Sequence, residues 1–220
     1  MRIIDDVVFD KICEDPDFAF YGRNLVDTDV FTWQHVKNYL NDTFHLGGVS
    51  LINDDGDKIN FSPCKHDAWP YDLFSGLEAG NSFLLANMER VNPKVHFISN
   101  IMSLVFDTWV TTNVYGGFSD QGRSFPIHAD DQIVLICQMV GQSEWFVYNE
   151  EWDLTPSTQV PDEGLCTTAV HTILNEGDVL YIPLRRYHKC IPMGSRLSLS
   201  VSVENGVYKQ PRTDYYGWRY

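Results

Sequence analysis

The 220-residue chain is 44% hydrophobic, which is enough to bury one sizeable core with room for a packed N-terminal extension. Its 30 acidic and 16 basic residues give a formal net charge of −14, which disfavours nonspecific binding to nucleic acid because phosphates are repelled. No apolar run approaches 18 residues, and the first residues, MRIIDDVVFD, carry charges where a signal peptide would be apolar. A membrane span and secretion are therefore not expected.

Cysteine usage indicates a reducing compartment. The five cysteines are odd in number, widely scattered and form no C-x-x-C pair, which argues against a disulfide framework and a zinc knuckle. We therefore expect free thiols and a cytoplasmic protein. The densest basic stretch, PLRRYHK at 183–189, is interpreted as a loop near the mouth of a site, given the overall negative charge.

The first half of the chain combines helical and strand patterns. Residues 29–43, DVFTWQHVKNYLNDT, are expected to form a helix capped by Asp29 or Thr32. The stretch 47–61, GGVSLINDDGDKINF, predicts two short strands across a turn. Residues 70–109 are predicted to be mostly helical, with a break near Asn92.

From about residue 108 the period changes to that of strands. Short β-branched or aromatic runs alternate with turns rich in Gly, Pro, Asn and Asp, a spacing that predicts an all-β sandwich or barrel. In the last run, RLSLSVSVEN (196–205), apolar residues occupy one face and Arg196 with three serines the other. The polar face must either meet solvent or line a polar cavity.

A polar triplet stands directly before one of these apolar runs. In FPIHADDQIVLICQMVGQSEW (125–145), His128 and Asp130 are two residues apart, so on an extended strand they point to the same face. Burying such groups without partners is costly, about 2–7 kcal/mol for a neutral polar group and more for a charge. Either a hydrogen-bond network or a metal ion could compensate.

The stretch NEGDVLYIPLRRYHKC (175–190) supplies a further candidate ligand, because His188 follows a predicted apolar strand by a few residues. His128, Asp130 and His188 together offer two imidazoles and one carboxylate, a set that suits Fe(II) and leaves three coordination positions open. An H-x-D triplet alone often occurs by chance, and a lone histidine at a strand end is usually a satisfied surface or core residue. The triplet and the later histidine together, in this order and spacing, favour a metal site.

From about residue 22 to 205 the chain resembles the Jumonji C (JmjC) and cupin-like family of Fe(II)- and 2-oxoglutarate-dependent oxygenases, and it is most similar to the branch that contains the ribosomal oxygenases. The resemblance implies a mainly β fold with N-terminal helices and a double-stranded β-helix, or jelly roll. It implies an N-terminal α+β region (1–105) packed on the barrel, a catalytic core (106–205) and a C-terminal tail (206–220). The matching elements are FTWQHVKNYL, NVY (113–115), QG (121–122), HADD, LICQMVGQSEW and EGDVLYIPLRRYH.

Carried over residue by residue, the resemblance implies that His128, Asp130 and His188 are the iron ligands and the catalytic residues. It also implies that Asn113 and Tyr115 line the 2-oxoglutarate pocket. Trp145 matches a recurrent aromatic residue after the G-x-x-x-W turn, for which a core position is the favoured interpretation.

One position departs from the family pattern. Two residues after the glycine of that turn, where this branch usually has a Lys or Arg that pairs with the distal carboxylate of 2-oxoglutarate, the chain has Ser143. A partly buried dicarboxylate needs a cationic partner. Arg196, which forms with Ser198 the Arg-x-Ser that other Fe(II)/2-oxoglutarate oxygenases use on this strand, is the predicted replacement. The alternative is that Arg196 begins the strand and points to solvent.

These features support three hypotheses. The leading one is an Fe(II)- and 2-oxoglutarate-dependent oxygenase that hydroxylates a protein, a peptide or a small molecule, as a monomer or homodimer without a membrane or nonspecific nucleic-acid partner. The departure at Ser143 supports a second, a non-catalytic cupin-like module that binds a metal or a partner. The third is a cupin dioxygenase that uses iron without 2-oxoglutarate.

Overall fold

The computed structural model describes residues 3–43, 48–53, 56–61, 69–119, 124–153 and 162–204. The helices are α1 (Asp6–Glu14), α2 (Trp33–Asn38), α3 (Trp69–Glu78) and α4 (Pro93–Phe106), with shorter turns at Thr28–Val30, Tyr39–Thr43, Met88–Arg90 and Glu163–Leu165. The strands are β1 (Phe20–Gly22), β2 (Gly48–Ile52), β3 (Lys58–Phe61), β4 (Ser82–Ala86), β5 (Val110–Gly117), β6 (Gln132–Glu151), β7 (Thr168–Leu174), β8 (Val179–Ile182) and β9 (Arg186–Glu204).

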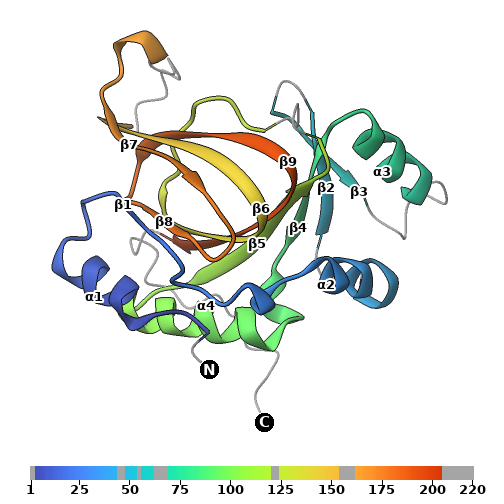
Figure 1. The fold of residues 1–220 in the computed structure, drawn as a ribbon, viewed down its shortest axis with the longest axis horizontal. Coiled ribbons are helices and arrows are strands. Elements are labelled where there is room, and N and C mark those ends of the chain that lie inside the picture. The colour runs from blue at the N-terminus through green and yellow to red at the C-terminus, as the bar shows by residue number, and fades with distance from the viewer. Residues whose placement is uncertain are drawn as a thin grey trace.

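The strands form an antiparallel sheet that curls into a barrel (Figure 1). Its order is β1-β8-β6-β9-β5-β4-β2-β3, and β7 pairs with the second half of β6. The helices α1 and α4 lie along one side of this barrel in Figure 1. Together with the helices from the first half of the chain, the barrel confirms the expected fold class, a mainly β jelly roll.

Two long bent strands close the barrel. β6 and β9 pair from Gln132 with Glu204 to Glu151 with Arg186, with register shifts around Val140. At the bend Gly141 has a φ of 65°, and a Cβ there would lie 2.0 Å from the Ser195 carbonyl oxygen, so only glycine fits. This bend lies between the apolar runs QIVLICQMV (132–140) and EWFVYNE (144–150), so both runs belong to one strand.

The prediction for residues 70–109 was partly wrong. The helices α3 and α4 are present, but residues 82–86 form strand β4, which pairs with β2 and β5. Gly80 at φ 90° and Asn87 at φ 60° bracket this strand. A short apolar run that is buried as a central strand has no period that separates it from a helix.

The predicted elements around it were confirmed. Helix α2 and the turn after it fall within residues 29–43, preceded by Thr32, whose backbone N–H donates to His35 Nδ1 at 3.0 Å. β2 and β3 pair across the expected turn, of which Asp54 and Asp55 lie outside the described residues.

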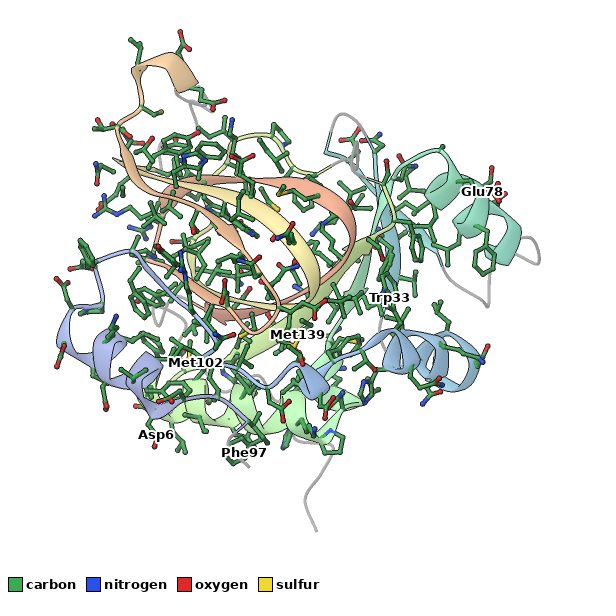
Figure 2. The ribbon with its side chains drawn as sticks, viewed as in Figure 1. Asp6, Trp33, Glu78, Phe97, Met102 and Met139 are labelled. Carbon is green, nitrogen blue, oxygen red and sulfur yellow. The ribbon has the colours of Figure 1, made fainter. Side chains whose placement is uncertain are left out.

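The main hydrophobic core lies between α4 and the barrel. Met102 of α4 and Met139 of β6 are buried there, whereas Phe97 on the outer side of α4 is 48% exposed (Figure 2). The apolar face of the last strand joins the same core through Leu197, Leu199, Val201 and Val203. Its polar face is buried too, which identifies the polar cavity, and not solvent, as the surrounding of that face.

The sheet continues across residue 105, since β1 to β4 and β5 to β9 belong to it together. The division into regions 1–105, 106–205 and 206–220 stays a prediction, and the tail lies outside the described residues. In the part of the chain that the structure describes, no helix has both the length and the apolar character needed to cross a membrane.

Candidate metal centre

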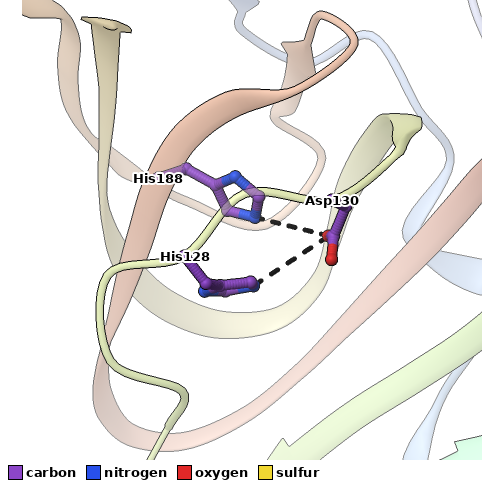
Figure 3. Close-up of side chains that lie close together, drawn as sticks. All are labelled: His128, Asp130 and His188. Atoms are coloured by element: carbon purple, nitrogen blue, oxygen red, sulfur yellow. Dashed lines mark ion pairs between the residues drawn. The ribbon is translucent and has the colours of Figure 1, made fainter. Parts of the chain in front are cut away.

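The three candidate ligands, His128, Asp130 and His188, lie close together (Figure 3). His128 lies just before β6 and His188 near the start of β9, where they form an isolated antiparallel bridge. The His128 N–H donates to the His188 carbonyl at 3.1 Å, and the His188 N–H donates back at 2.8 Å. The Asp130 carbonyl accepts a bond from the Arg185 N–H at 3.1 Å, which fixes the backbone of the third residue.

The spacing of the side chains leaves room for an ion between them. The Asp130 carboxylate oxygen Oδ2 lies 3.9 Å from His128 Nε2 and 3.7 Å from His188 Nε2. These separations are too long for hydrogen bonds. One ligand atom from each residue lies within 4.8 Å of the others. Donor atoms that each bind one metal at about 2.1 Å lie roughly 3–4 Å apart, so the geometry fits a shared ion.

Backbone carbonyls select the tautomer of both imidazoles. His128 Nδ1 lies 2.8 Å from the Pro126 carbonyl oxygen, and His188 Nδ1 lies 2.9 Å from that of Arg186. A carbonyl only accepts, so each Nδ1 must carry the proton. Each Nε2 is then left with a lone pair on the side of Asp130, which is the arrangement that a metal-binding histidine needs.

Burial keeps His188 neutral. Its side chain is 5% exposed. Burial and the nearby His128 lower the pKa of His188 to about 4, although the charge of Asp130 and the hydrogen bond to the Arg186 carbonyl act to raise it. The imidazole is therefore a neutral ligand at pH 7, next to a carboxylate that is 41% exposed.

A narrow cavity of about 60 Å³ opens beside these residues. Trp145 borders it, is 8% exposed and is also part of a hydrophobic cluster, so the expected core position is compatible with a place at the site. The cavity is lined by Ile52, Ser82, Tyr115, Ser124, Phe125, His128, Asp130, Val134, Ile136, Trp145, His188, Cys190, Arg196, Ser198 and Ser200.

Arg196 is a buried cation in this cavity with hydrogen-bonding capacity left over. Only 2% of the residue is exposed. Its Nη2 donates to Ser82 Oγ at 2.7 Å, whereas its buried Nη1 has no hydrogen-bond partner among the described residues. Burial lowers the pKa of the guanidinium below its ordinary value, and a buried, half-satisfied cation favours an anionic partner.

Ser143 lies inside the barrel, where the family pattern would have a cation. It is fully buried, and its Oγ donates to Gln138 Oε1 at 2.7 Å and accepts the Trp145 indole N–H at 2.9 Å. Ser198 Oγ donates to the same Gln138 oxygen at 2.8 Å. A neutral network thus replaces the expected charge at this position. Gln138 and Ser82 were missed by the sequence reasoning, because neither belongs to a recognisable motif.

The remaining predicted pocket residues lie on one strand. Tyr115 lines the cavity, and burial, with the charge of Asp130, raises the pKa of its phenol, so the hydroxyl stays protonated. Asn113 lies on the same face of β5, opposite Ser200 of β9, but is not among the lining residues. The matched pair QG (121–122) lies outside the described residues.

The basic stretch 183–189 forms the turn into β9 and its first residues, and it contains the candidate ligand His188. Its cations are paired with acids: Arg185 with Asp131 at 2.7 Å, Arg186 with Glu151 at 3.0 Å, and Lys189 with Glu163. The expected loop near the site is thus present at 183–185, whereas residues 186–189 belong to strand β9, and the described cations of the stretch are neutralised.

A jelly-roll barrel that gathers two imidazoles and a carboxylate in one cavity defines the class of cupin-fold metal-centre proteins. The model of the JmjC domain matches residues 84–210, more than half of the chain, and the protein belongs to this family.

Individual relatives agree with this assignment. Ribosomal oxygenase 1 of Rattus norvegicus is 27% identical over 174 residues, 77% of this chain, and a probable ribosomal oxygenase of Haemophilus influenzae is 26% identical over 160 residues, 70% of this chain. The alignments cover 28% and 38% of those relatives, so the chain spans well under two thirds of their length.

A solved structure shows the same fold. The ribosomal oxygenase YcfD of Escherichia coli, in complex with cobalt and 2-oxoglutarate, matches with a TM-score of 0.55 at 16% identity. The match covers 90% of this chain and 50% of that one.

Proposed function

We propose that the protein is an Fe(II)- and 2-oxoglutarate-dependent oxygenase that hydroxylates its substrate. The observation that carries this proposal is the pairing, in one cavity, of a two-histidine, one-carboxylate cluster with a buried arginine whose Nη1 has no partner among the described residues. The first set suits a metal, and the second suits a carboxylate. The names of the relatives, and the complex of YcfD with cobalt and 2-oxoglutarate, support the same activity.

Each residue would have a defined task. His128, Asp130 and His188 would hold Fe(II) on one face, and Arg196 would bind the distal carboxylate of 2-oxoglutarate beside Tyr115. Iron bound there would supply the oxidative chemistry that couples decarboxylation of 2-oxoglutarate to hydroxylation of a C–H bond. The fixed tautomers keep both Nε2 atoms available as ligands, and the buried Arg196 and Ser198 form part of the cavity wall.

The test is production of succinate from 2-oxoglutarate in the presence of Fe(II) and a substrate. His128→Ala is expected to abolish it, because one ligand of the facial set is lost. His171→Ala is the matched control, since His171 is 52% exposed and pairs with Glu144 on the outer face of the barrel. Unchanged turnover in His128→Ala would refute the assignment.

The second candidate function is a non-catalytic cupin-like module, and the buried neutral Ser143 favours it. A calorimetric titration of 2-oxoglutarate into Mn(II)-loaded protein separates the two candidates. Binding that depends on Arg196 supports the oxygenase, and no binding supports the module. Oxygen consumption with substrate alone would instead support an iron dioxygenase that does not use 2-oxoglutarate.

For the substrate we propose a protein side chain, since the relatives are named ribosomal oxygenases. A cytoplasmic location follows from the free thiols expected of the cysteine pattern. We also propose that the protein acts as a monomer or homodimer without a membrane partner. Its net charge of −14 disfavours nonspecific binding to nucleic acid.

A further inference from the structure

Ser82 of β4 holds the guanidinium of Arg196 in one orientation. Its Oγ accepts the Nη2–H at 2.7 Å, and both residues are 2% exposed. The two residues are 114 positions apart in the chain. They meet because β5 lies between β4 and β9 in the sheet and the arginine side chain extends across it.

Gly117 of β5 provides the space for that crossing. It pairs directly with Arg196 in the register of β5 and β9. A Cβ at position 117 would lie 3.0 Å from Arg196 Nη1 and 3.6 Å from Ser82 Oγ. Any side chain there would press on the guanidinium at the nitrogen that has no hydrogen-bond partner in the described part of the chain.

We infer that Ser82 and Gly117 are positioning residues that set the selectivity of the cavity for a 2-oxo acid with a distal carboxylate. The inference rests on the proposed function. Ser82 occupies one N–H of Nη2 and leaves Nη1 for the anion, so the cation is ordered before the ligand arrives and less rotamer entropy is lost on binding. Gly117 keeps the approach to Nη1 open. This arrangement explains how a cation from β9 can act at a site whose usual cation position carries a serine.

The test compares two ligands of equal carbon-chain length. 2-Oxoglutarate and 2-oxopentanoate, which lacks the distal carboxylate, are titrated calorimetrically into Mn(II)-loaded protein. Ser82→Ala is expected to weaken 2-oxoglutarate binding about tenfold and to leave 2-oxopentanoate binding unchanged, because only the dicarboxylate uses the oriented cation. Gly117→Ala is likewise expected to lower the ratio of the affinity for 2-oxoglutarate to the affinity for 2-oxopentanoate.

Ser50→Ala is the matched control. Ser50 is a buried serine on the neighbouring strand β2, and its Oγ donates to Asn60 Oδ1 at 2.6 Å, away from the cavity lining. Its loss removes a comparable hydrogen bond and is expected to leave the affinity ratio unchanged.

The outcomes separate this inference from the function on which it rests. Failure of the wild-type protein to bind 2-oxoglutarate would overturn the proposed function. If Ser82→Ala and Gly117→Ala both keep the wild-type preference for 2-oxoglutarate over 2-oxopentanoate, only the positioning role is overturned. The same holds if the variants lose affinity for both ligands equally. Should Ser82→Ala fail to fold, Gly117→Ala alone decides.

Discussion

The two ends of the cavity are ordered in different ways. At the metal end, His128 and His188 exchange two backbone hydrogen bonds, and each Nδ1 is held by the carbonyl of the residue two positions earlier. At the cation end, Arg196 depends on a serine that is 114 residues away and on the absence of a side chain at Gly117. The metal end is thus organised by local backbone geometry, and the cation end by tertiary contacts.

This difference predicts where the site tolerates change. Backbone bonds persist when side chains around them are substituted, so the ligand geometry should be robust. The orientation of a buried guanidinium is a balance between one hydrogen bond and the space around it, so the cation end should respond to distant substitutions.

The largest effect is expected from removing the cationic side chain at position 196 and placing one at position 143 instead. Arg196→Ala is expected to weaken 2-oxoglutarate binding to Mn(II)-loaded protein about 100-fold, because a buried carboxylate loses its charged partner. Ser143→Lys in that background is expected to restore about tenfold of the lost affinity, because Ser143 and Arg196 both lie beside Cys190. Burial raises the pKa of the Cys190 thiol, and the charge of Arg196 and a hydrogen bond with Ser143 oppose that rise. Calorimetry measures both.

Mn(II) binding without 2-oxoglutarate serves as the control, and it is expected to be unchanged in both variants. An undiminished affinity for 2-oxoglutarate in Arg196→Ala would show that the two ends are not the two halves of one ligand site.

The same contrast explains what could be predicted from the sequence. The order of the strands from residue 108 and the convergence of the ligand set rest on local patterns, namely turn residues, alternation and the H-x-D spacing. The alternation in 196–203 left two possibilities for Arg196, and only the burial of both strand faces decided between them. β4 was missed because its apolar run has no period of its own. Gln138, Ser82 and Gly117 act through partners on other strands, and no local pattern marks them.

An intermediate effect is expected at the metal end when the pH falls. The pKa of His188 in the folded protein is lowered to about 4, below its unfolded value of 6.5. The unfolded chain therefore takes up a proton between these values while the folded chain does not, so stability falls as the pH drops from about 6.5 to 4 and changes no further below. Between pH 7 and pH 5 this amounts to about 2 kcal/mol.

Urea unfolding of metal-free protein at the two pH values measures this loss. His188→Gln removes the titrating group and is expected to lose about 2 kcal/mol less than the wild type over the same interval. Equal losses in both proteins would mean that the imidazole is not held neutral by burial.

The smallest effects concern the two serines that share Gln138. Ser198→Ala removes one donor to Gln138 Oε1, which still accepts from Ser143, so the expected cost is about 1 kcal/mol of unfolding free energy. Ser143→Ala removes the other donor and also leaves the buried Trp145 indole N–H without its acceptor, so it should cost about 1 kcal/mol more. Urea unfolding at pH 7 measures the difference.

A substitution of Ser198 also tests whether Arg196 alone binds the distal carboxylate of 2-oxoglutarate. Its hydroxyl proton is directed at Gln138, so it can reach an anion only if that bond breaks. We expect Ser198→Ala to change 2-oxoglutarate affinity less than about threefold, well below the loss in Arg196→Ala. A tenfold loss would show that the hydroxyl turns toward the ligand, and the anion would then be held by the Arg-x-Ser pair and not by the arginine that Ser82 orients.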